Sequence, residues 1–347
     1  MDKFILDLKL FDDDRVINKT TSNTPGNDLT AEMKTFYEKV LLENAKPNLV
    51  HQQFGKKVPI PRNSGKTVEF RKYKTLPKAL TPLTEGVTPQ GDKLSVSTVV
   101  ATCEQYGNYV MMTDQLDLYA IDNNMAEATE LIADNAGATL DTVTRNELHT
   151  GTNVLFAENA TTHVTPVSRA DLTSANKFTP RVAAKAAAIM KKNNVPTYDG
   201  FYVCIIHPYV EFDLITNPEW VGVQEYTDSN VKKIFEGEIG RLYKIRFVVS
   251  SEAKVYKSTG GETDTDMDIA TYGCLVIGKG AYGVVDVEGG ALEIIAKQKG
   301  SAGSEDPLNQ RATVGWKITG YTAKILQEER LLRVECASDF SDVDDAN

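Results

Sequence analysis

Residues Gly278 to Gly283 are the stretch whose spacing comes closest to a nucleotide-binding fingerprint. The sequence GKGAYG has the pattern G-x-G-x-x-G and follows the strand-like run YGCLVIG, residues 272–278. In dinucleotide-binding domains, these glycines open a helix whose N-terminus faces the pyrophosphate. Here they lead into VVDVEGG, which is rich in β-branched residues and is then broken by glycines. The pattern therefore favours a turn between strands over the cofactor site of a dinucleotide-binding oxidoreductase.

Three acidic residues have the spacing with which a calcium-binding loop begins, namely Asp264, Asp266 and Asp268. Such a loop needs glycine at its sixth position and a bidentate glutamate at its twelfth. Those positions hold Ile269 and Leu275. The segment is therefore predicted to be a solvated acidic loop without a metal site.

The histidines and cysteines do not form a pattern that binds a metal or activates a nucleophile. They are His51, His149, His163, His207, Cys103, Cys204, Cys274 and Cys336. Because no H-x-x-x-H or C-x-x-C occurs, a zinc site would need ligands from distant segments. His207 lies between an apolar run and Pro208, which is typical of a histidine at the end of a strand. We expect reduced, semi-buried thiols, no catalytic residue, no cofactor and no metal.

The composition is that of a folded, acidic protein. The chain has 347 residues, of which 41% are hydrophobic, and its formal net charge is −10. This length corresponds to about two domains at ~150 residues each. A protein that follows the phosphates of a duplex usually has a basic domain, which this charge argues against. We expect neither a signal peptide nor a membrane span, because Asp2, Asp7 and Asp12 interrupt the start and no apolar run approaches ~18 residues.

The first third of the chain is predicted to contain an arm and a long hairpin. Residues 1–28 are polar and predict a mobile arm, and residues 30–44 have the apolar period of an amphipathic helix. Residues 66–76 and 94–113 are rich in strand-forming residues. The connection between them, LPKALTPLTEGVTPQG from Leu76 to Gly91, has three prolines and no histidine or cysteine. Such a segment suits a contact better than a reaction.

The longest predicted helix runs from Asn124 to His149, and Thr150 and Gly151 close it. Its apolar positions predict a face that packs on the same subunit, and this face includes Leu131, Leu140 and Val143. Charged positions are expected nearer solvent or a neighbouring subunit, and these are Asp134, Asp141 and Arg145.

The rest of the chain mixes helices and strands. Helices are predicted at 180–194 and 208–216, and strands at 201–207, 245–251 and 272–278. Residues 313–337 are amphipathic and fit either a strand or a helix. The acidic tail, residues 338–347, is predicted to be disordered.

Four stretches of this sequence resemble a known family: LPKALTPLTEGVTPQG (76–91), ATELIADNAGATLDTVTRNELHTGTNVLF (128–156), GKGAYGVVDV (278–287) and GSAGSEDPLNQRATVGWK (300–317). With the order of the segments, they are similar to the major capsid proteins of tailed bacteriophages with the Hong Kong phage-type (Johnson) fold. The similarity is closest to the phage N-four-like group. The likeness covers residues 30–336.

The resemblance implies an α+β chain in four parts. Residues 1–65 would be the N-terminal arm, and 66–113 the extended loop, a β-hairpin that overlaps a neighbouring subunit. Residues 114–200 would be the peripheral domain with its spine helix. Residues 201–347 would hold the axial domain, returning strands of the peripheral domain and the acidic tail.

The same resemblance implies a structural protein, not an enzyme. Hexamers and pentamers of the chain would form the icosahedral shell of a virion around double-stranded DNA, without sequence-specific contacts to it. Assembly would take place in the cytoplasm of the host bacterium. Residues 1–28 are too short for the helical scaffolding segment of some relatives, so we expect a separate scaffolding protein, a portal and optionally a decoration protein. An encapsulin-like nanocompartment shell protein, which shares the fold, is the alternative.

The long hairpin supplies most candidates for contact between subunits. Its prolines reduce the entropy lost when the loop is ordered on a neighbour, and its leucines and valine offer apolar contacts. The basic cluster nearby could bind nucleic acid or an acidic neighbour, and the acidic chain favours the second. The candidates are Leu76, Pro77, Leu80, Pro82, Leu83, Val87, Pro89, Arg71, Lys72, Lys74 and Arg145.

Overall fold

The computed structural model describes residues 50–61, 65–73, 76–83, 85–88, 91–119, 124–220, 238–257, 269–287, 292–301, 306–341, 344 and 346–347. The predicted arm, the helix at 30–44, the three aspartates at 264–268, Lys74 and Pro89 lie outside these residues. The chain divides into two compact units. Residues 106–137 and 292–318 belong to the smaller unit, and residues 47–105, 138–291 and 319–347 to the larger.

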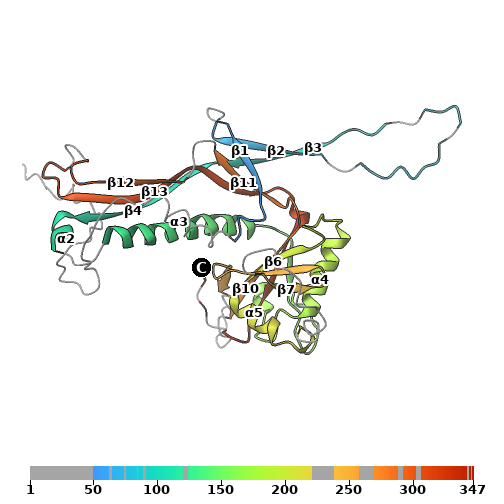
Figure 1. Cartoon of the computed structure of the whole chain (residues 1–347). Helices are drawn as coiled ribbons and strands as arrows, with labels where there is room; N and C mark the ends of the chain where they lie inside the picture. Colours follow the sequence, from blue (N-terminus) through green and yellow to red (C-terminus); the bar gives the residue numbers. More distant parts are fainter. Residues whose placement is uncertain are drawn as a thin grey trace, which may run out of the picture. The chain divides into compact units, whose positions relative to one another are not determined.

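The smaller unit packs a helix against antiparallel strands (Figure 1). Its elements are α2 (Asp114–Tyr119), the first half of α3 (Asn124–Leu148), most of β4 (Glu104–Thr113), β12 (Glu293–Lys297) and the start of β13 (Arg311–Ile325). β13 pairs with both β4 and β12. The indole N–H of Trp316 donates to Asn135 on α3 over 3.0 Å, so this face of β13 is turned toward the helix.

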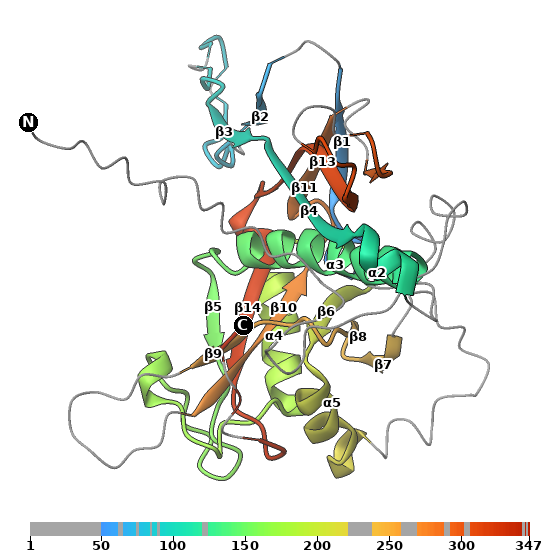
Figure 2. The same ribbon diagram turned by 90° about the vertical axis from the view of Figure 1, so that its left-hand side faces the viewer.

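A seven-stranded sheet forms the body of the larger unit (Figure 2). Its strands are β5 (Val154–Phe156), β14 (Leu331–Cys336), β10 (Ala270–Ile277), β6 (Tyr202–Ile206), β8 (Ile245–Val249) and β7 (Glu238–Leu242), in this order, with β9 (Val255–Lys257) paired to β10. Every residue of β6 and β10 is buried. The described helices of this unit are the second half of α3, α4 (Pro180–Lys192), α5 (Pro208–Ile215) and the short 3-10 turns η2 (Arg169–Asp171) and η4 (Glu328–Arg330).

Helix α4 shows how local signals and burial agree. Thr179 caps its first turn by accepting a hydrogen bond from the backbone of Val182, and Pro180 occupies the first helical position, where no amide donor is needed. Val182, Ala186 and Met190 follow at intervals of four and are at most 1% exposed. They join the strands of the sheet in one hydrophobic core. The sequence predicted this helix correctly.

The remaining strands lie near the hairpin. β1 (Lys56–Ile60) pairs in parallel with β11 (Tyr282–Val287), and β11 pairs with the end of β13. β2 (Thr67–Tyr73) and β3 (Val96–Thr102) form a separate two-stranded sheet. The ambiguous residues 313–337 are mainly strands, because β13 and β14 occupy most of them.

The prediction of a disordered tail was wrong for its described residues. The hydroxyl of Tyr272 donates to the Ser341 carbonyl over 3.2 Å and to the Asp344 carboxylate over 2.7 Å. The side chain of Asn347 accepts from the backbone N–H of Val255 over 3.0 Å. Groups of β10 and β9 therefore hold the acidic tail by hydrogen bonds, which its composition alone does not predict.

The packed face of α3 differs from the predicted one. Leu140 is buried as expected, Val143 is half-buried, and Leu131 is 65% exposed. Asp134 is exposed as expected, whereas Asp141 and Arg145 are buried at 0% and 2% exposure, against the prediction. The buried stripe follows helical spacing through small and polar residues as well as apolar ones. It includes Met125, Ala128, Thr129, Ile132, Ala136, Leu140, Asp141, Thr144, Arg145 and Leu148.

We predict that Leu140→Ala lowers the free energy of unfolding of the unassembled chain by about 2–5 kcal/mol, because it leaves a cavity in a packed site. Leu131→Ala, on the same helix, should change it by less than about 0.5 kcal/mol because the side chain already meets water. Denaturant unfolding followed by circular dichroism measures both. Equal losses from the two variants would contradict the observed helix face.

Candidate inter-subunit surface

The β2–β3 hairpin is anchored only at its base. Its register runs from Thr67 opposite Thr102 to Tyr73 opposite Val96. Val68 and Phe70 of β2 are half-buried and pack near Ala101 and Val285. Beyond these residues the strands alternate between exposed and half-buried positions, and neither strand becomes buried toward the loop. The hairpin thus keeps its register by backbone pairing while its far end lacks a core.

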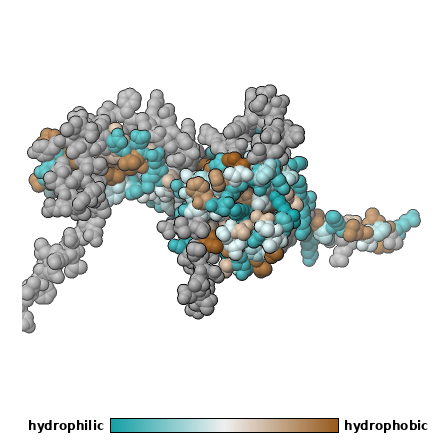
Figure 3. All heavy atoms as spheres, turned by 90° about the horizontal axis from the view of Figure 1, so that it is seen from below, coloured by the Kyte–Doolittle hydropathy of each residue, from teal (hydrophilic) through white to brown (hydrophobic). Residues whose placement is uncertain are grey.

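The connecting loop exposes large apolar side chains. Every described residue from Leu76 to Val96 is exposed. Leu80, Leu83 and Val87 are 83%, 77% and 63% exposed. Figure 3 shows the loop as the narrow extension at the right, where brown hydrophobic residues lie among teal hydrophilic ones. Contiguous exposed apolar side chains on a folded protein mark an interaction surface.

The structure places the other candidates of the hairpin in two groups. Leu76, Pro77 and Pro82 are exposed in the same loop. Arg71 and Lys72 lie on β2 and already have partners within the chain: Arg71 is 3.9 Å from Glu69, and Lys72 is 3.9 Å from Glu329. Solvent-exposed ion pairs of this kind contribute only about 0–1 kcal/mol, so both cations can change partners easily.

The sequence analysis missed exposed apolar residues on the strands of the hairpin and just before β3. These are Tyr73, Leu94, Val96 and Val100, with exposures from 46% to 72%. Their signal was present, because Leu94, Val96 and Val100 recur at even spacing and therefore share one side of the returning strand. The candidate surface thus consists of the loop and this outward side of the hairpin.

The predicted returning strand, 94–113, is two strands with different partners. β3 pairs with β2, whereas β4 pairs with β13. At the break, the backbone N–H of Cys103 donates to the Lys66 carbonyl over 2.9 Å. A Cβ on Gly107 would lie 2.8 Å from the carbonyl oxygen of Trp316, so glycine permits the close approach of β4 to β13. The hairpin is therefore shorter than predicted.

A groove of about 450 Å³ lies on the strands of the smaller unit. Its apolar and aromatic lining comes from Tyr109, Met111, Ile295 and Trp316, and its basic lining from Lys297, Arg311 and Lys317. None of the described residues that line it is acidic. A groove with aromatic walls can accept an extended, proline-containing segment.

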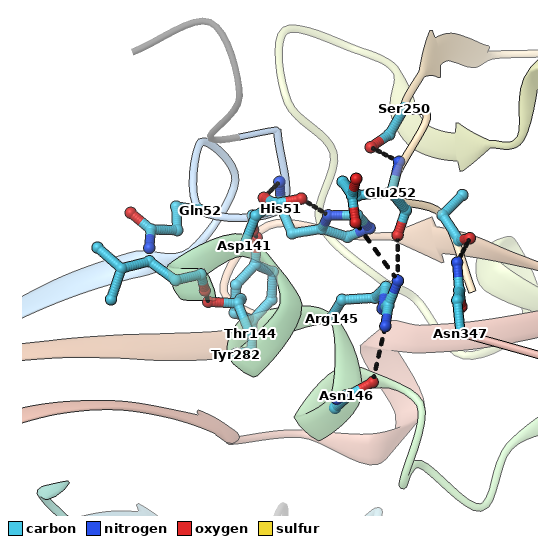
Figure 4. Close-up of polar contacts among 12 residues, drawn as sticks. His51, Gln52, Asp141, Thr144, Arg145, Asn146, Ser250, Glu252, Tyr282 and Asn347 are labelled. Atoms are coloured by element: carbon cyan, nitrogen blue, oxygen red, sulfur yellow. Dashed lines mark hydrogen bonds and ion pairs between the residues drawn. The ribbon is translucent and has the colours of Figure 1, made fainter. Parts of the chain in front are cut away.

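Arg145, the one candidate outside the hairpin, lies in a buried polar cluster (Figure 4). Asp141 accepts from the backbone N–H of His51 over 2.8 Å and lies 2.6 Å from His51 Nδ1. Arg145 Nη1 donates to the Glu252 carbonyl over 2.7 Å. Burial lowers the pKa of Arg145, and the carboxylates of Glu252 and Asp141 oppose this effect. The expectation that Arg145 faces solvent or a neighbour was wrong, because these partners hold it inside the chain.

The same cluster fixes the segment that precedes β1. The hydroxyl of Tyr282 donates to the carbonyl of His51, and the hydroxyl of Tyr198 to the carbonyl of Phe54. Gln52 donates to the hydroxyl of Tyr321. Residues 51–54 form turns, so these side chains supply hydrogen bonds that no sheet provides.

The glycine-rich stretch and His207, which the sequence analysis tested for chemical roles, are both part of the local backbone structure. Gly278 to Gly280 form a turn that leads into strand β11, and Gly280 has φ +72°, so the structure has a turn between strands as predicted. His207 ends β6, and its Nδ1 accepts from the backbone of Tyr209 over 3.2 Å, as expected of a histidine at a strand end. Burial lowers the pKa of His207.

The four cysteines are free and all are buried. Burial raises the pKa of the thiols of Cys204 and Cys274, which disfavours a nucleophilic thiolate. In the described part of the chain, no cluster of His, Cys, Asp and Glu is arranged to hold a metal ion. No helix among the described residues is long and apolar enough to cross a membrane.

Residues 96–334 match the family model described as phage capsid protein, which covers more than half of the chain. This chain belongs to the phage capsid protein family. Its fold is that of the capsids of tailed phages, of the Hong Kong phage type, and it is a structural protein of the virion shell. As a major capsid protein it assembles from many copies of itself.

Solved capsids of low sequence identity share the fold of this capsid protein. The capsid of Ralstonia phage GP4 is 15% identical, with 93% of this chain and 100% of that chain covered and a TM-score of 0.62. The capsid of cyanophage P-SCSP1u is also 15% identical, with 92% and 93% covered and a TM-score of 0.60. No curated protein matches the capsid protein in sequence.

An encapsulin also shares this fold. The SrpI encapsulin of Synechococcus elongatus PCC 7942 is 8% identical, with 91% of this chain and 96% of that chain covered and a TM-score of 0.53. This likeness is one of fold alone. The family match separates the two possibilities and favours the phage capsid.

We predict that Arg145→Glu prevents stable folding of the capsid protein, because it buries a carboxylate beside Asp141 and Glu252 and removes their cation. The expected loss is about 3–5 kcal/mol of unfolding free energy. Asp134→Lys, an exposed charge reversal on the same helix, should stay within about 0.5 kcal/mol of the parent. Thermal melts of unassembled chains make the comparison. A folded Arg145→Glu protein with a parental melting temperature would contradict this role of the buried cluster.

Proposed function

We propose that the exposed β2–β3 loop is the segment through which one copy of this capsid protein contacts the next. The observation that carries the proposal is the run of unburied apolar residues, among them Leu80, Leu83 and Val87. Full burial of such side chains contributes about 1.5–3 kcal/mol each. Pro77 and Pro82 limit the conformations of the free loop, which reduces the entropy cost of docking. Leu76 and Pro89 complete the contact.

The groove of the smaller unit is our proposed receiving surface on the neighbouring copy. Its aromatic walls, Tyr109 and Trp316, suit the prolines of the loop, and Ile295 suits the leucines. The volume of about 450 Å³ fits a few side chains rather than a folded domain. Since every copy has one loop and one groove, such a contact is heterologous, and it closes into rings when the rotation between copies brings the last copy back to the first.

The basic residues of the hairpin belong to the same proposal. Arg71 and Lys72, together with Lys74, would pair with acidic residues of the neighbouring copy, whose net charge is −10. The weak pairs of Arg71 and Lys72 with Glu69 and Glu329 support an exchange of partners. Arg145 is not part of this surface because it is 2% exposed.

The division of the chain follows from the resemblance to capsid proteins. We assign residues 1–65 to the N-terminal arm, 66–113 to the extended loop, 114–200 to the peripheral domain with α3 as its spine, and 201–347 to the axial domain with returning strands and the tail. The β3–β4 break supports a shorter hairpin within the second part.

The partners and setting also follow from that resemblance. Hexamers and pentamers would enclose double-stranded DNA, and the net charge of −10 supports a wall that does not adhere to it. Assembly in the host bacterial cytoplasm would use a separate scaffolding protein and a portal, with a decoration protein as an optional addition. We assign the chain no enzymatic activity, which the buried thiols and the glycine turn support.

Replacing residues 78–90 by Asn-Gly tests the loop. Circular dichroism of the variant should match that of the parent, because the loop makes no core, while electron microscopy should show a loss of particles. The double variant Leu80→Ser/Leu83→Ser should also lower the particle yield. Lys78→Ser, in the same loop, should leave the yield unchanged because it removes no apolar contact. Normal particles from the shortened chain would overturn the proposal.

A further inference from the structure

The end of α3 is attached to the seven-stranded sheet by a histidine. His149 follows the last residue of the helix and is 8% exposed. Its backbone N–H donates to the Arg145 carbonyl over 3.0 Å, and its own carbonyl accepts from Arg333 of β14. Its ring lies against Gly273 of β10, where an added Cβ would be 2.6 Å from the ring Cε1. The imidazole therefore touches the sheet with no space to move toward it.

The two ring nitrogens of His149 have unequal surroundings. Nδ1 lies 2.8 Å from the hydroxyl of Tyr256 on β9, and the two rings meet edge to face with centroids 5.7 Å apart. Nε2 is buried and has no hydrogen-bond partner among the residues that the structure describes. A proton added to this imidazole would thus create a second N–H without an acceptor, or break the bond that Tyr256 donates.

Cationic side chains approach this imidazole from several elements. Arg145 comes from α3, Arg333 from β14, and Lys254 from the turn before β9. A further guanidinium, that of Arg169, lies 3.7 Å from the centroid of the Tyr256 ring. A positive charge on His149 would be repelled from all of these directions.

The carboxylates in the same region already have other hydrogen-bond or ion-pair partners. Glu335 accepts from Arg169 over 2.6 Å and from Arg333 over 2.8 Å. Glu252 lies 4.0 Å from Arg145, and Asp141 is bound by His51. Glu328 accepts from the backbone of Thr152 over 3.1 Å. None of these described contacts gives a protonated His149 a counter-charge.

We infer that His149 is an acid-sensitive joint: protonation of its imidazole detaches the end of α3 from β9, β10 and β14. This device goes beyond the structural role of the chain and does not depend on the loop contact. The packing on Gly273 holds the ring against the sheet, and the buried Nε2 without an acceptor among the described residues, together with the surrounding cations, favours a neutral ring in this closed state. Detachment places the ring in water, where it can carry a proton.

The sign of the pH dependence follows from linkage. Burial lowers the pKa of His149 well below 6.5, and the nearby cations Arg333, Arg145 and Lys254 lower it further. In the open state the pKa returns to about 6.5, so the open state binds more protons below that pH. The joint is therefore fully stable above pH 6.5 and loses stability as the pH falls below it.

Hydrogen exchange of the full-length, unassembled chain at pH 7.5 and 5.5 tests the joint. Protection factors, corrected for intrinsic exchange, are compared for the amides of 148–151 and of β10. An imidazole of ordinary pKa is about tenfold more protonated than neutral at pH 5.5, so the parent should lose about tenfold more protection there than His149→Gln. His163→Gln, at an exposed histidine, should behave like the parent. Equal losses in His149→Gln and the parent would overturn the inference.

A second measurement covers the case in which His149→Gln does not fold. Nitrogen-15 spectra of the four imidazoles in the parent report their protonation directly. We expect the His149 imidazole to stay neutral until the amides of 148–151 lose protection. Protonation of His149 near pH 6.5 with these amides still protected would contradict an acid-sensitive joint.

Discussion

Exposing leucine side chains to water is unfavourable, yet this capsid protein keeps several exposed leucines on the β2–β3 loop. Leu80 and Leu83 are more than three-quarters exposed, whereas the seven-stranded sheet and its helices bury many large apolar residues in one core. Only the base of the hairpin reaches such a core, through Val68 and Phe70. In the proposed account, the loop gains its stabilisation from a surface outside its own chain, and a repeated contact between copies would supply one at every position of a shell.

A subunit that leaves its loop uncovered must be stable without it. The larger unit achieves this with a sheet whose central strands, β6 and β10, are wholly buried, and with polar groups that are paired inside. Asp141 binds His51, and Arg145 binds the carbonyl of Glu252. Removing one partner of such a pair lowers the free energy of unfolding by more than the intact pair contributes, because it leaves a buried polar group unpaired. The cluster therefore favours this one packing of α3 over others. The contacts between copies can then stay individually weak.

Local patterns in the sequence predicted where helices and strands form. Which of their faces are buried depends on residues far away in the sequence, and local patterns do not show these. Helix α4 was predictable because Thr179 and Pro180 begin it and its apolar residues recur every four positions. The buried face of α3 was not, because Asp141 is hydrogen-bonded by a residue 90 positions away. The break between β3 and β4 depends on β13, which also lies far along the chain. The loop was predicted from its composition to be a contact, and this stays a proposal, whereas the exposed apolar residues of β3 were not predicted.

A disulfide between copies tests the contact most directly. Leu83→Cys and Ile295→Cys, combined in one chain, place a thiol in the loop and another in the groove, and the four native cysteines are buried. Mild oxidation of purified particles, followed by non-reducing electrophoresis, should give a ladder of linked subunits from the double variant and monomers from each single variant. Intact particles of the double variant that yield only monomers would contradict docking of the loop in the groove.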